Sequence, residues 1–277
     1  MDHIDCSNHV ISVSNAVREN YLVRTGRSPS KTSVIPNAID CSKFPADPSK
    51  ISPLGTINIV FMARITWRKG IDFLIGLIPR ICKKYPQVYW IIGGNGDMDP
   101  ELKFLIQKFK LEDRVELLGY VNHKDVGSVL NRGHIFLNAS VTEAFCIAAL
   151  EAASAGLLVV TTDVGGTPEI LPEDLLYLAK PTIPSLNKML EKAIADVHKI
   201  SPSENHERIR KFYDWRDVSA RVEKIYYEVL QEPYMTFKQR FNNASETCEM
   251  FTLLCSLLIR LFDAVFRQLP LLGLYLL

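Results

Sequence analysis

Residues His134–Glu169 read HIFLNASVTEAFCIAALEAASAGLLVVTTDVGGTPE, and the rest of the chain can be interpreted outward from this segment. It contains, in order, an apolar run, a helical pattern ended by a glycine, a second apolar run and a glycine-rich loop, at Ile135–Leu137, Ala144–Ala155, Leu157–Val160 and Gly165–Pro168. Short apolar runs predict buried strands, and glycine with proline predicts a tight loop. The order predicts one strand–helix–strand–loop unit of a parallel sheet, where ligands bind in crevices at the carboxyl ends of the strands.

Two acidic residues, Glu143 and Glu151, bracket the predicted helix with seven residues between them. Eight steps along an α-helix separate two backbone positions by ~12 Å, so one acid would lie at the helix start and the other about two turns further on. A ligand with polar groups at both ends, such as a nucleotide sugar, suits that span. The alternative is an ordinary helix with solvated acids, because two glutamates at this spacing are common.

Two residues beside the predicted strand at Ile135–Leu137 have ordinary interpretations. His134 directly precedes the strand, so we expect a packed imidazole and not a catalytic base. Asn138-Ala-Ser matches the glycosylation acceptor pattern. Because Asn138 ends a predicted core strand, we interpret this match as chance.

The composition limits the class of protein. The chain has 277 residues, of which 47% are hydrophobic and 23% charged, with a net charge of +1. This length allows one large or two small globular domains, and the near-neutral charge gives no reason to propose a nucleic-acid partner. The six cysteines form no C-x-x-C pair and no zinc-binding spacing. We therefore expect reduced thiols, mostly buried, and a folded part that lies in the cytosol.

The remaining chain predicts further strands and helices in alternation. Strands are predicted at residues 8–13, 32–35, 57–63, 88–92, 115–118 and 175–178, and helices at residues 15–23, 70–85, 101–110, 123–132, 185–199, 203–212 and 217–230. Ser14 is a suitable N-cap for the first of these helices. From residue 57 onward, six strands alternate with helices. This pattern predicts an α/β fold with a doubly wound parallel sheet.

A basic loop follows the predicted strand at residues 57–63, with the sequence RITWRKGID. Arg64, Arg68 and Lys69 lie in this loop, and Gly70 opens the next helix. Cations at the carboxyl end of a strand, beside a helix start, suit a diphosphate group. A solvated basic loop is the alternative interpretation.

Glycines and acids follow the next predicted strand in the segment GGNGD, at residues 93–97. Its glycines let backbone approach a ligand closely, but the spacing does not match a full dinucleotide fingerprint. Asp97 and Asp99 form the D-x-D pattern of metal-dependent transferases. They also precede Pro100 at a predicted helix start, where acids favour the helix dipole. We favour this capping role and expect no metal.

The pair Glu143 and Glu151, followed by GG-x-P-E, resembles retaining glycosyltransferases with two Rossmann-like lobes (GT-B fold, family 4). The longer string TEAFCIAALEAASAGLLVVTTDVGGTPEILPE resembles, within that family, the catalytic subunits that transfer N-acetylglucosamine to phosphatidylinositol. The resemblance covers about residues 8–230 and is most specific over residues 57–71 and 134–173. It implies a GT-B type carboxyl-terminal Rossmann-like lobe and the first step of GPI-anchor synthesis.

The resemblance also implies roles for individual residues. Arg64 and Lys69 would hold the diphosphate of UDP-GlcNAc, Glu143 would accept hydrogen bonds from sugar hydroxyls, and Glu151 would bind the ribose. The residues expected to contribute donor contacts through backbone or apolar groups are Gly94 and Gly96 on the nucleotide side, Tyr120 and Val121 near the uracil, and Ala144, Phe145 and Cys146 at the helix start.

The resemblance further implies partners and a place in the cell. The acceptor would be phosphatidylinositol, and the chain would belong to a membrane transferase complex with other subunits. The catalytic lobe would face the cytosol at the endoplasmic reticulum membrane. Fixed cations would replace a metal, so no cofactor is expected beyond the donor substrate.

Three regions are predicted along the chain. VIPNAID, at residues 34–40, resembles the segment that crosses from the first lobe to the second. Residues 1–35 would then be a remnant of the amino-terminal acceptor lobe, residues 36–232 the donor-binding lobe, and residues 233–277 a helical tail.

The tail contains two uncharged apolar runs, Met250–Ile259 and Leu269–Leu277, with Arg260, Asp263 and Arg267 between them. The charges follow one helical stripe, so Asp263 can pair with either arginine. A membrane span needs ~20 mostly apolar residues, and each central charge costs ~2.5–3.5 kcal/mol. We therefore expect a membrane-associated hydrophobic helix that either spans the bilayer or lies at its interface. A buried soluble helix is the third alternative.

Two other functions fit the same motifs. One is a family 4 glycosyltransferase with a different donor sugar, and the other is a non-catalytic fragment that binds donor or regulates a complex. The acceptor site of the family lies in the first lobe, most of which would precede Met1. We therefore predict that the isolated chain binds donor weakly and does not turn over. A radiolabelled-sugar transfer assay on the purified chain checks this, and robust product would contradict it.

Overall fold

The computed structural model describes residues 7–47, 49, 55–199, 201–233, 236, 239 and 257–262. The chain divides into two compact units. The larger comprises Ser12–Arg18 and Val34–Val222, and the smaller comprises Met1–Ile11, Glu19–Ser33 and Glu223–Leu277. The predicted limits of the three regions at residues 35 and 232 stay predictions.

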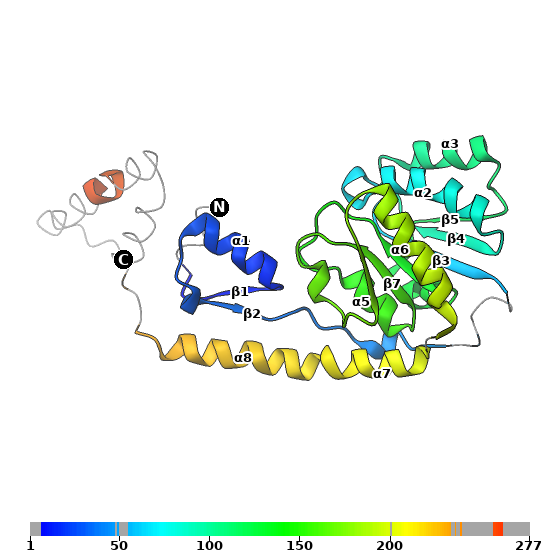
Figure 1. Cartoon of the computed structure of the whole chain (residues 1–277). Coiled ribbons are helices and arrows are strands. Elements are labelled where there is room, and N and C mark those ends of the chain that lie inside the picture. The colour runs from blue at the N-terminus through cyan, green and yellow to red at the C-terminus, as the bar shows by residue number, and fades with distance from the viewer. Residues whose placement is uncertain are drawn as a thin grey trace, which may run out of the picture. The chain divides into compact units, whose positions relative to one another are not determined.

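A six-stranded sheet forms the centre of the larger unit (Figure 1). In spatial order its strands are β5 (Val115–Gly119), β4 (Val88–Gly93), β3 (Ile57–Met62), β6 (Ile135–Asn138), β7 (Leu158–Thr162) and β8 (Leu176–Ala179). All neighbouring strands are parallel. The chain proceeds outward from β3 through β4 to β5, then returns to β6 and proceeds the other way. This reversal makes the carboxyl ends of β3 and β6 the topological switch point, where open α/β sheets bind ligands.

Helices cover both faces of the sheet, which confirms the doubly wound arrangement. The helices that follow β3 along the chain are α2 (Ile71–Lys84), α3 (Asp99–Phe109), α4 (Val126–Leu130), α5 (Ile147–Ser154), α6 (Ile183–Asp196), α7 (Pro202–Phe212) and α8 (Trp215–Gln231). One apolar core joins β3 to α2, α3 and α6 through Ile59 and Phe61. A second core joins the opposite face to α5 and α7 through Val60 and Phe136. Strands buried on both faces are apolar at nearly every position, which is why these runs are recognisable in the sequence.

The amino-terminal elements are short. β1 (Val10–Ser12) and β2 (Thr32–Val34) pair in a two-stranded sheet, and α1 (Asn15–Thr25) connects them. Ser14 caps α1 as predicted, because its Oγ accepts a hydrogen bond from the backbone N–H of Val17 at 3.3 Å.

Two predicted helices begin later than expected. The helix predicted from Ala144 begins at Ile147, because the carbonyl of Glu143 accepts from Gly166 N (3.1 Å) and that of Ala144 accepts from Ser14 Oγ (2.8 Å). These two carbonyls are therefore not available as acceptors for an additional helical turn before Ile147. The helix predicted at residues 123–132 is a 3-10 turn at His123–Asp125 followed by α4.

The predicted hydrophobic tail helix falls almost entirely outside the described residues. Residues 257–262 are helical. Among the residues that the structure describes, no helix is both long and apolar enough to cross a membrane.

The cysteines that the structure describes agree with the expected free thiols. Cys41, Cys82 and Cys146 are buried and unpaired with one another. Cys6, Cys248 and Cys255 fall outside the described residues.

His134 closes the amino end of β6 against β3. Its ring Nδ1 accepts a hydrogen bond from Asn58 N at 3.0 Å, and its carbonyl accepts from Leu158 N at 3.0 Å. Burial lowers the pKa of His134 below 6.5, with a smaller contribution from the positive charge of His198. His134 is thus a packed neutral imidazole, as the sequence predicts.

This packing predicts a pH dependence of stability. Between pH 6.5 and the lowered pKa of His134, the unfolded chain binds a proton that the folded chain does not. The free energy of unfolding therefore falls as pH falls through this window, by up to about 1.4 kcal/mol per pH unit. Urea unfolding of wild type and His134→Asn at several pH values measures the effect. The advantage of wild type should shrink toward acid, and a constant difference would contradict the prediction.

Candidate functional site

The loops after β3 and β4 contact each other backbone to backbone. A Cβ at Gly94 would overlap the carbonyl oxygen of Ala63, and a Cβ at Gly96 would overlap that of Ile65. Ile65 N donates to Asn95 O at 3.0 Å, and Met98 N donates to Ile65 O at 3.0 Å. The two glycines therefore fix the loop that carries Arg64, in addition to the ligand-side role predicted for them.

The loops after β3 and β6 make a second close contact. Gly70 has a φ of +76°, and a Cβ there would overlap the carbonyl of Ala139. Val141 N donates to Arg68 O at 3.0 Å. The basic loop after β3 and the acidic loop after β6 are therefore held together directly at the switch point.

The loop after β7 supports the acidic loop from its other side. Gly165 has a φ of +53°, and a Cβ on it would overlap the carbonyl oxygen of Glu143. A Cβ on Gly166 would overlap the carbonyl of Ala144 and the side chain of Ser14. The glycine pair of GG-x-P-E is thus required by the path of the chain at Glu143.

These contacts bring two predicted site residues together. The Lys69 ammonium forms an ion pair with Glu143 Oε1, in which the two side chains are 25% and 13% exposed. Ser140 Oγ donates to the same Oε1 at 2.9 Å. One carboxylate oxygen therefore receives hydrogen bonds from a cation and from a hydroxyl group.

Behind this pair lies a buried polar network that the sequence analysis missed. Ser140 Oγ lies 2.7 Å from Asn138 Oδ1, and Asn138 Nδ2 donates to Thr161 Oγ1 at 2.9 Å. Thr162 Oγ1 donates to Ser140 O at 2.6 Å. Asn138 and Ser140 are also the residues that match the glycosylation pattern. The signal in the sequence is the presence of polar residues at the ends of two strands of otherwise apolar composition.

Arg64 lies in the same loop as Lys69 but outside the ion pair. Arg64 is exposed, and among the described residues no acceptor lies within hydrogen-bond distance of its guanidinium. Trp67 and Arg68 are also exposed. The loop thus presents one cation, Lys69, bound to Glu143 and two exposed cations, Arg64 and Arg68.

Glu151 is half-buried and lies within α5. Burial raises the pKa of Glu151, and the positive charge of His123 partly opposes the shift. Because Glu143 lies in the loop before α5, the predicted two-turn helical spacing between the two acids does not apply. The ribose role of Glu151 stays a prediction.

The three residues predicted at the helix start differ in what they offer a ligand. Ala144 is exposed, whereas Phe145 is 8% exposed and its ring packs against Tyr213 at 6.2 Å between centroids. Burial raises the pKa of the Cys146 thiol to about 12, and the charge of Glu143 adds to the effect. Phe145 and Cys146 are therefore suited to bind a donor through their backbone groups and not through their side chains.

Tyr120 and Val121 follow β5 at the same edge of the sheet. Tyr120 is 73% exposed, and Val121 is half-buried, with its Cγ2 3.1 Å from the position of a Cβ at Gly93. Gly94 N donates to Gly119 O at 2.7 Å, which joins this turn to the β4 loop. The base-binding role of these residues stays a prediction.

The D-x-D acids lie at the start of α3. Asp99 is its first residue, and Asp99 Oδ2 accepts from Gly96 N at 3.3 Å. Within the described part of the chain, no three His, Cys, Asp or Glu side chains gather in the way a metal ion needs. The metal-free reaction stays a prediction.

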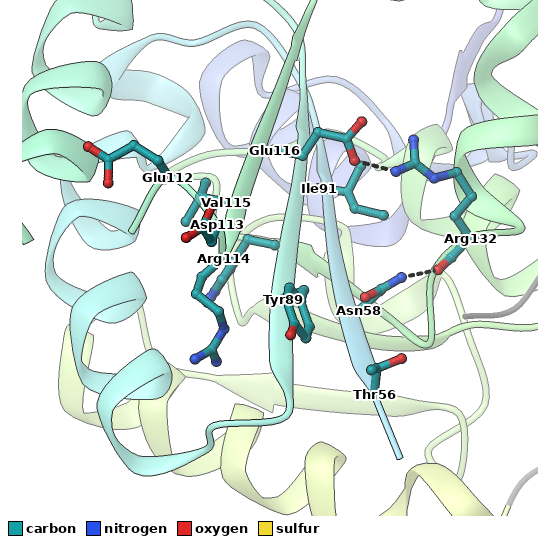
Figure 2. Close-up of a pocket in the computed structure, with 11 residues that line it drawn as sticks. Thr56, Asn58, Tyr89, Ile91, Glu112, Asp113, Arg114, Val115, Glu116 and Arg132 are labelled. Atoms are coloured by element: carbon teal, nitrogen blue, oxygen red, sulfur yellow. Dashed lines mark hydrogen bonds and ion pairs between the residues drawn. The ribbon is translucent and has the colours of Figure 1, made fainter. Parts of the chain in front are cut away.

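A different hollow, of about 290 Å³, lies at the opposite edge of the sheet, at the amino ends of β3, β4 and β5 (Figure 2). Three of its charged groups already have partners. Arg114 Nε donates to Val88 O at 2.9 Å and its guanidinium lies 5.0 Å from the Tyr89 ring centroid. Arg132 pairs with Glu116. These groups connect neighbouring strands, so we assign the hollow a structural role.

With the geometry established, comparison with known proteins identifies the family. The model of the family described as glycosyl transferases group 1 matches residues 45–212. The chain belongs to this family.

The curated relatives carry a narrower name. The chain is 43% identical, over 94% of its length, to a protein of Homo sapiens named as one of the subunits of phosphatidylinositol N-acetylglucosaminyltransferase, and covers 54% of that protein. It is 47% identical, over 80% of its length, to the protein of the same name in Arabidopsis thaliana, and covers 49% of it. The chain thus spans about half the length of these relatives.

Solved structures show the same fold. Sucrose-phosphate synthase from Thermosynechococcus elongatus matches with a TM-score of 0.70 and 22% identity, over 81% of this chain and 59% of that one. A glycosyltransferase from Rickettsia africae matches with a TM-score of 0.69 and 21% identity, over 82% and 64%. These likenesses concern the fold alone.

The glycine contacts predict a position-specific loss of stability. Gly165→Ala should cost about 2–5 kcal/mol, because a left-handed backbone strains alanine and the new Cβ overlaps Glu143 O. Gly119→Ala is the matched control, since Gly119 has a φ of +65° with nothing within 4 Å of the new Cβ. It should cost only about 1–2 kcal/mol. Urea unfolding measures both, and equal losses would show that the overlap at Glu143 is unimportant.

Proposed function

We propose that this chain supplies the donor-binding part of a retaining glycosyltransferase. The enzyme would transfer N-acetylglucosamine from UDP-GlcNAc to the inositol of phosphatidylinositol, the first step of GPI-anchor synthesis. One observation carries the proposal: a cation after β3 and a carboxylate after β6 meet at the switch point of the sheet. The names of relatives that are 43% and 47% identical support the choice of donor and acceptor.

The residues of the site have distinct tasks in this reaction. The bond between the anomeric carbon and the diphosphate oxygen breaks, and a bond to an inositol oxygen forms with the same anomeric configuration. Arg64 and Lys69 would stabilise the negative charge that grows on the departing diphosphate, because preorganised charges are usually the largest catalytic term. Backbone N–H groups in the first turn of α5 would add to this stabilisation.

The acid groups orient the donor. Glu143 accepts hydrogen bonds from sugar hydroxyls, and Glu151 accepts from the ribose. The apolar turn at Tyr120 and Val121 contacts the uracil. Each role follows from the resemblance, and Glu143, Tyr120 and Val121 lie in loops that follow strands of the sheet.

The proposal includes partners and a location. The enzyme would act without a metal, since fixed cations balance the diphosphate. It would belong to a complex at the endoplasmic reticulum membrane, with this lobe in the cytosol. The free buried thiols Cys41, Cys82 and Cys146 support a reducing compartment, and the relatives' names, which describe parts of a larger transferase, support further subunits.

Donor binding tests the site. Calorimetric titration should show that the chain binds UDP-GlcNAc in preference to GDP-mannose. Arg64→Ala and Lys69→Ala should each weaken binding at least about tenfold, the change that 1.4 kcal/mol produces. Arg80→Ala and Lys83→Ala, which remove exposed cations from α2, are the matched controls and should have no effect. Equal losses in all four variants would rule out a specific diphosphate site.

The acceptor is tested separately. Native membranes that contain the chain and its partners receive radiolabelled UDP-GlcNAc, and lipid is then extracted. Phosphatidylinositol-specific phospholipase C should release the label. A labelled lipid that resists this enzyme would exclude phosphatidylinositol as the acceptor.

A further inference from the structure

Lys69 and Glu143 are bound to each other, although the proposed reaction assigns them to different portions of the donor. Their side chains are 25% and 13% exposed, so both charges lie largely out of water. A diphosphate that binds Lys69 therefore competes with the Glu143 carboxylate for the same ammonium group. This competition has a different effect on a nucleoside diphosphate than on an intact nucleotide sugar.

A nucleoside diphosphate satisfies only half of the pair. It supplies an anion to Lys69, but it places further negative charge beside Glu143 and offers that carboxylate no replacement donor. Separating a largely buried ion pair is costly when one partner is left without compensation. Like charges close together in a protein interior repel strongly. The affinity for UDP alone should therefore be lower than it would be without the Glu143 carboxylate.

An intact nucleotide sugar satisfies both halves. Its diphosphate binds Lys69, and its sugar hydroxyls donate to the carboxylate that the lysine has left. Hydrogen bonds to a charged acceptor are among the stronger ones in proteins. Lys69 thus exchanges Glu143 for the diphosphate, and Glu143 exchanges Lys69 for the sugar hydroxyls.

Ser140 determines where this exchange takes place. It is 0% exposed, and its Oγ contacts Glu143 Oε1 at 2.9 Å and Asn138 Oδ1 at 2.7 Å. Asn138 is itself held by Thr161. Ser140 has a single hydroxyl proton for these two oxygens, and when it donates to Glu143 it holds the carboxylate beside the end of β6.

We propose that the Lys69–Glu143 pair selects the intact nucleotide sugar over the nucleoside diphosphate that remains after transfer. Glu143 is the specificity-determining residue, and Ser140 is a positioning residue that acts through it. After the sugar leaves, Glu143 recovers Lys69 and promotes release of the diphosphate. This inference rests on the proposed function, because it takes UDP-GlcNAc as the donor.

Arg64 provides an internal comparison. It is exposed and lies outside the pair, so it attracts the diphosphate of either ligand without involving Glu143. Removing it should weaken both UDP and UDP-GlcNAc, and UDP at least as much, because the terminal phosphate of UDP carries additional negative charge. Removing the charge of Glu143 should change their ratio.

The experiment is calorimetric titration of the 277-residue chain with UDP and with UDP-GlcNAc. Wild type should bind UDP-GlcNAc more tightly than UDP. Glu143→Gln should bind UDP more tightly than wild type does, by several-fold, and should reduce the preference for UDP-GlcNAc by about tenfold or more. Arg64→Ala should weaken both ligands without reducing the preference for UDP-GlcNAc.

A second variant tests the positioning role. Ser140→Ala should reduce the preference by weakening UDP-GlcNAc. Ser154→Ala is the matched control, because Ser154 is also 0% exposed and its Oγ donates to Phe44 O at 3.1 Å, away from the pair. It should lower the melting temperature without changing the preference, which separates positioning from general stability.

The outcomes distinguish the two proposals. If wild type binds neither ligand, the proposed function and this inference are both overturned. If wild type binds UDP-GlcNAc but Glu143→Gln leaves the preference unchanged, or weakens UDP, only the inference is overturned. A preference that Ser154→Ala reduces as much as Ser140→Ala does would remove the positioning role of Ser140.

Discussion

Backbone atoms of three loops touch at the carboxyl edge of the sheet, and this contact is what the site depends on. Glycine stands at two of the close approaches between these loops: Gly70 faces Ala139, and Gly165 faces Glu143. A side chain at either position would move one loop away from the other. Lys69 and Glu143 lie on the loops that these glycines hold together. The glycines of these loops therefore act on the chemistry through the spacing of loops, and only secondarily by admitting a ligand.

The charged pair derives its properties from where the sheet reverses. β3 and β6 are neighbours in space but lie 73 residues apart at Met62 and Ile135 along the chain, with β4 and β5 formed between them. At such a reversal, open α/β sheets bind ligands outside the carboxyl ends of the strands. One loop contributes cations, the other a carboxylate fixed by buried hydroxyl and amide groups. Opposite charges on two separate loops, each held by backbone contacts to the other, can bind opposite portions of one ligand.

The fold and the proposed function of this protein rest on different observations. Solved structures at 21% and 22% identity share the architecture and include enzymes of different names, so the fold does not specify a substrate. The choice of UDP-GlcNAc and phosphatidylinositol comes from relatives at 43% and 47% identity, of which the chain spans about half. The geometry contributes the contacts of the site: Lys69 is paired with Glu143, and Arg64 is exposed.

The sequence alone determined the elements that depend on local patterns. Apolar runs predicted all six strands of the central sheet, and the basic loop and the GG-x-P-E loop were recognisable by composition. Tertiary structure decided the rest. The start of α5 at Ile147, the loop conformation of Glu143 and the bond from Ser140 all depend on the folded arrangement, including partners distant in the chain such as Ser14, which is 130 residues from Ala144. Helical and strand patterns report neighbours within about four positions. A carbonyl that bonds to a residue far along the chain leaves no such pattern, so only the folded protein shows it.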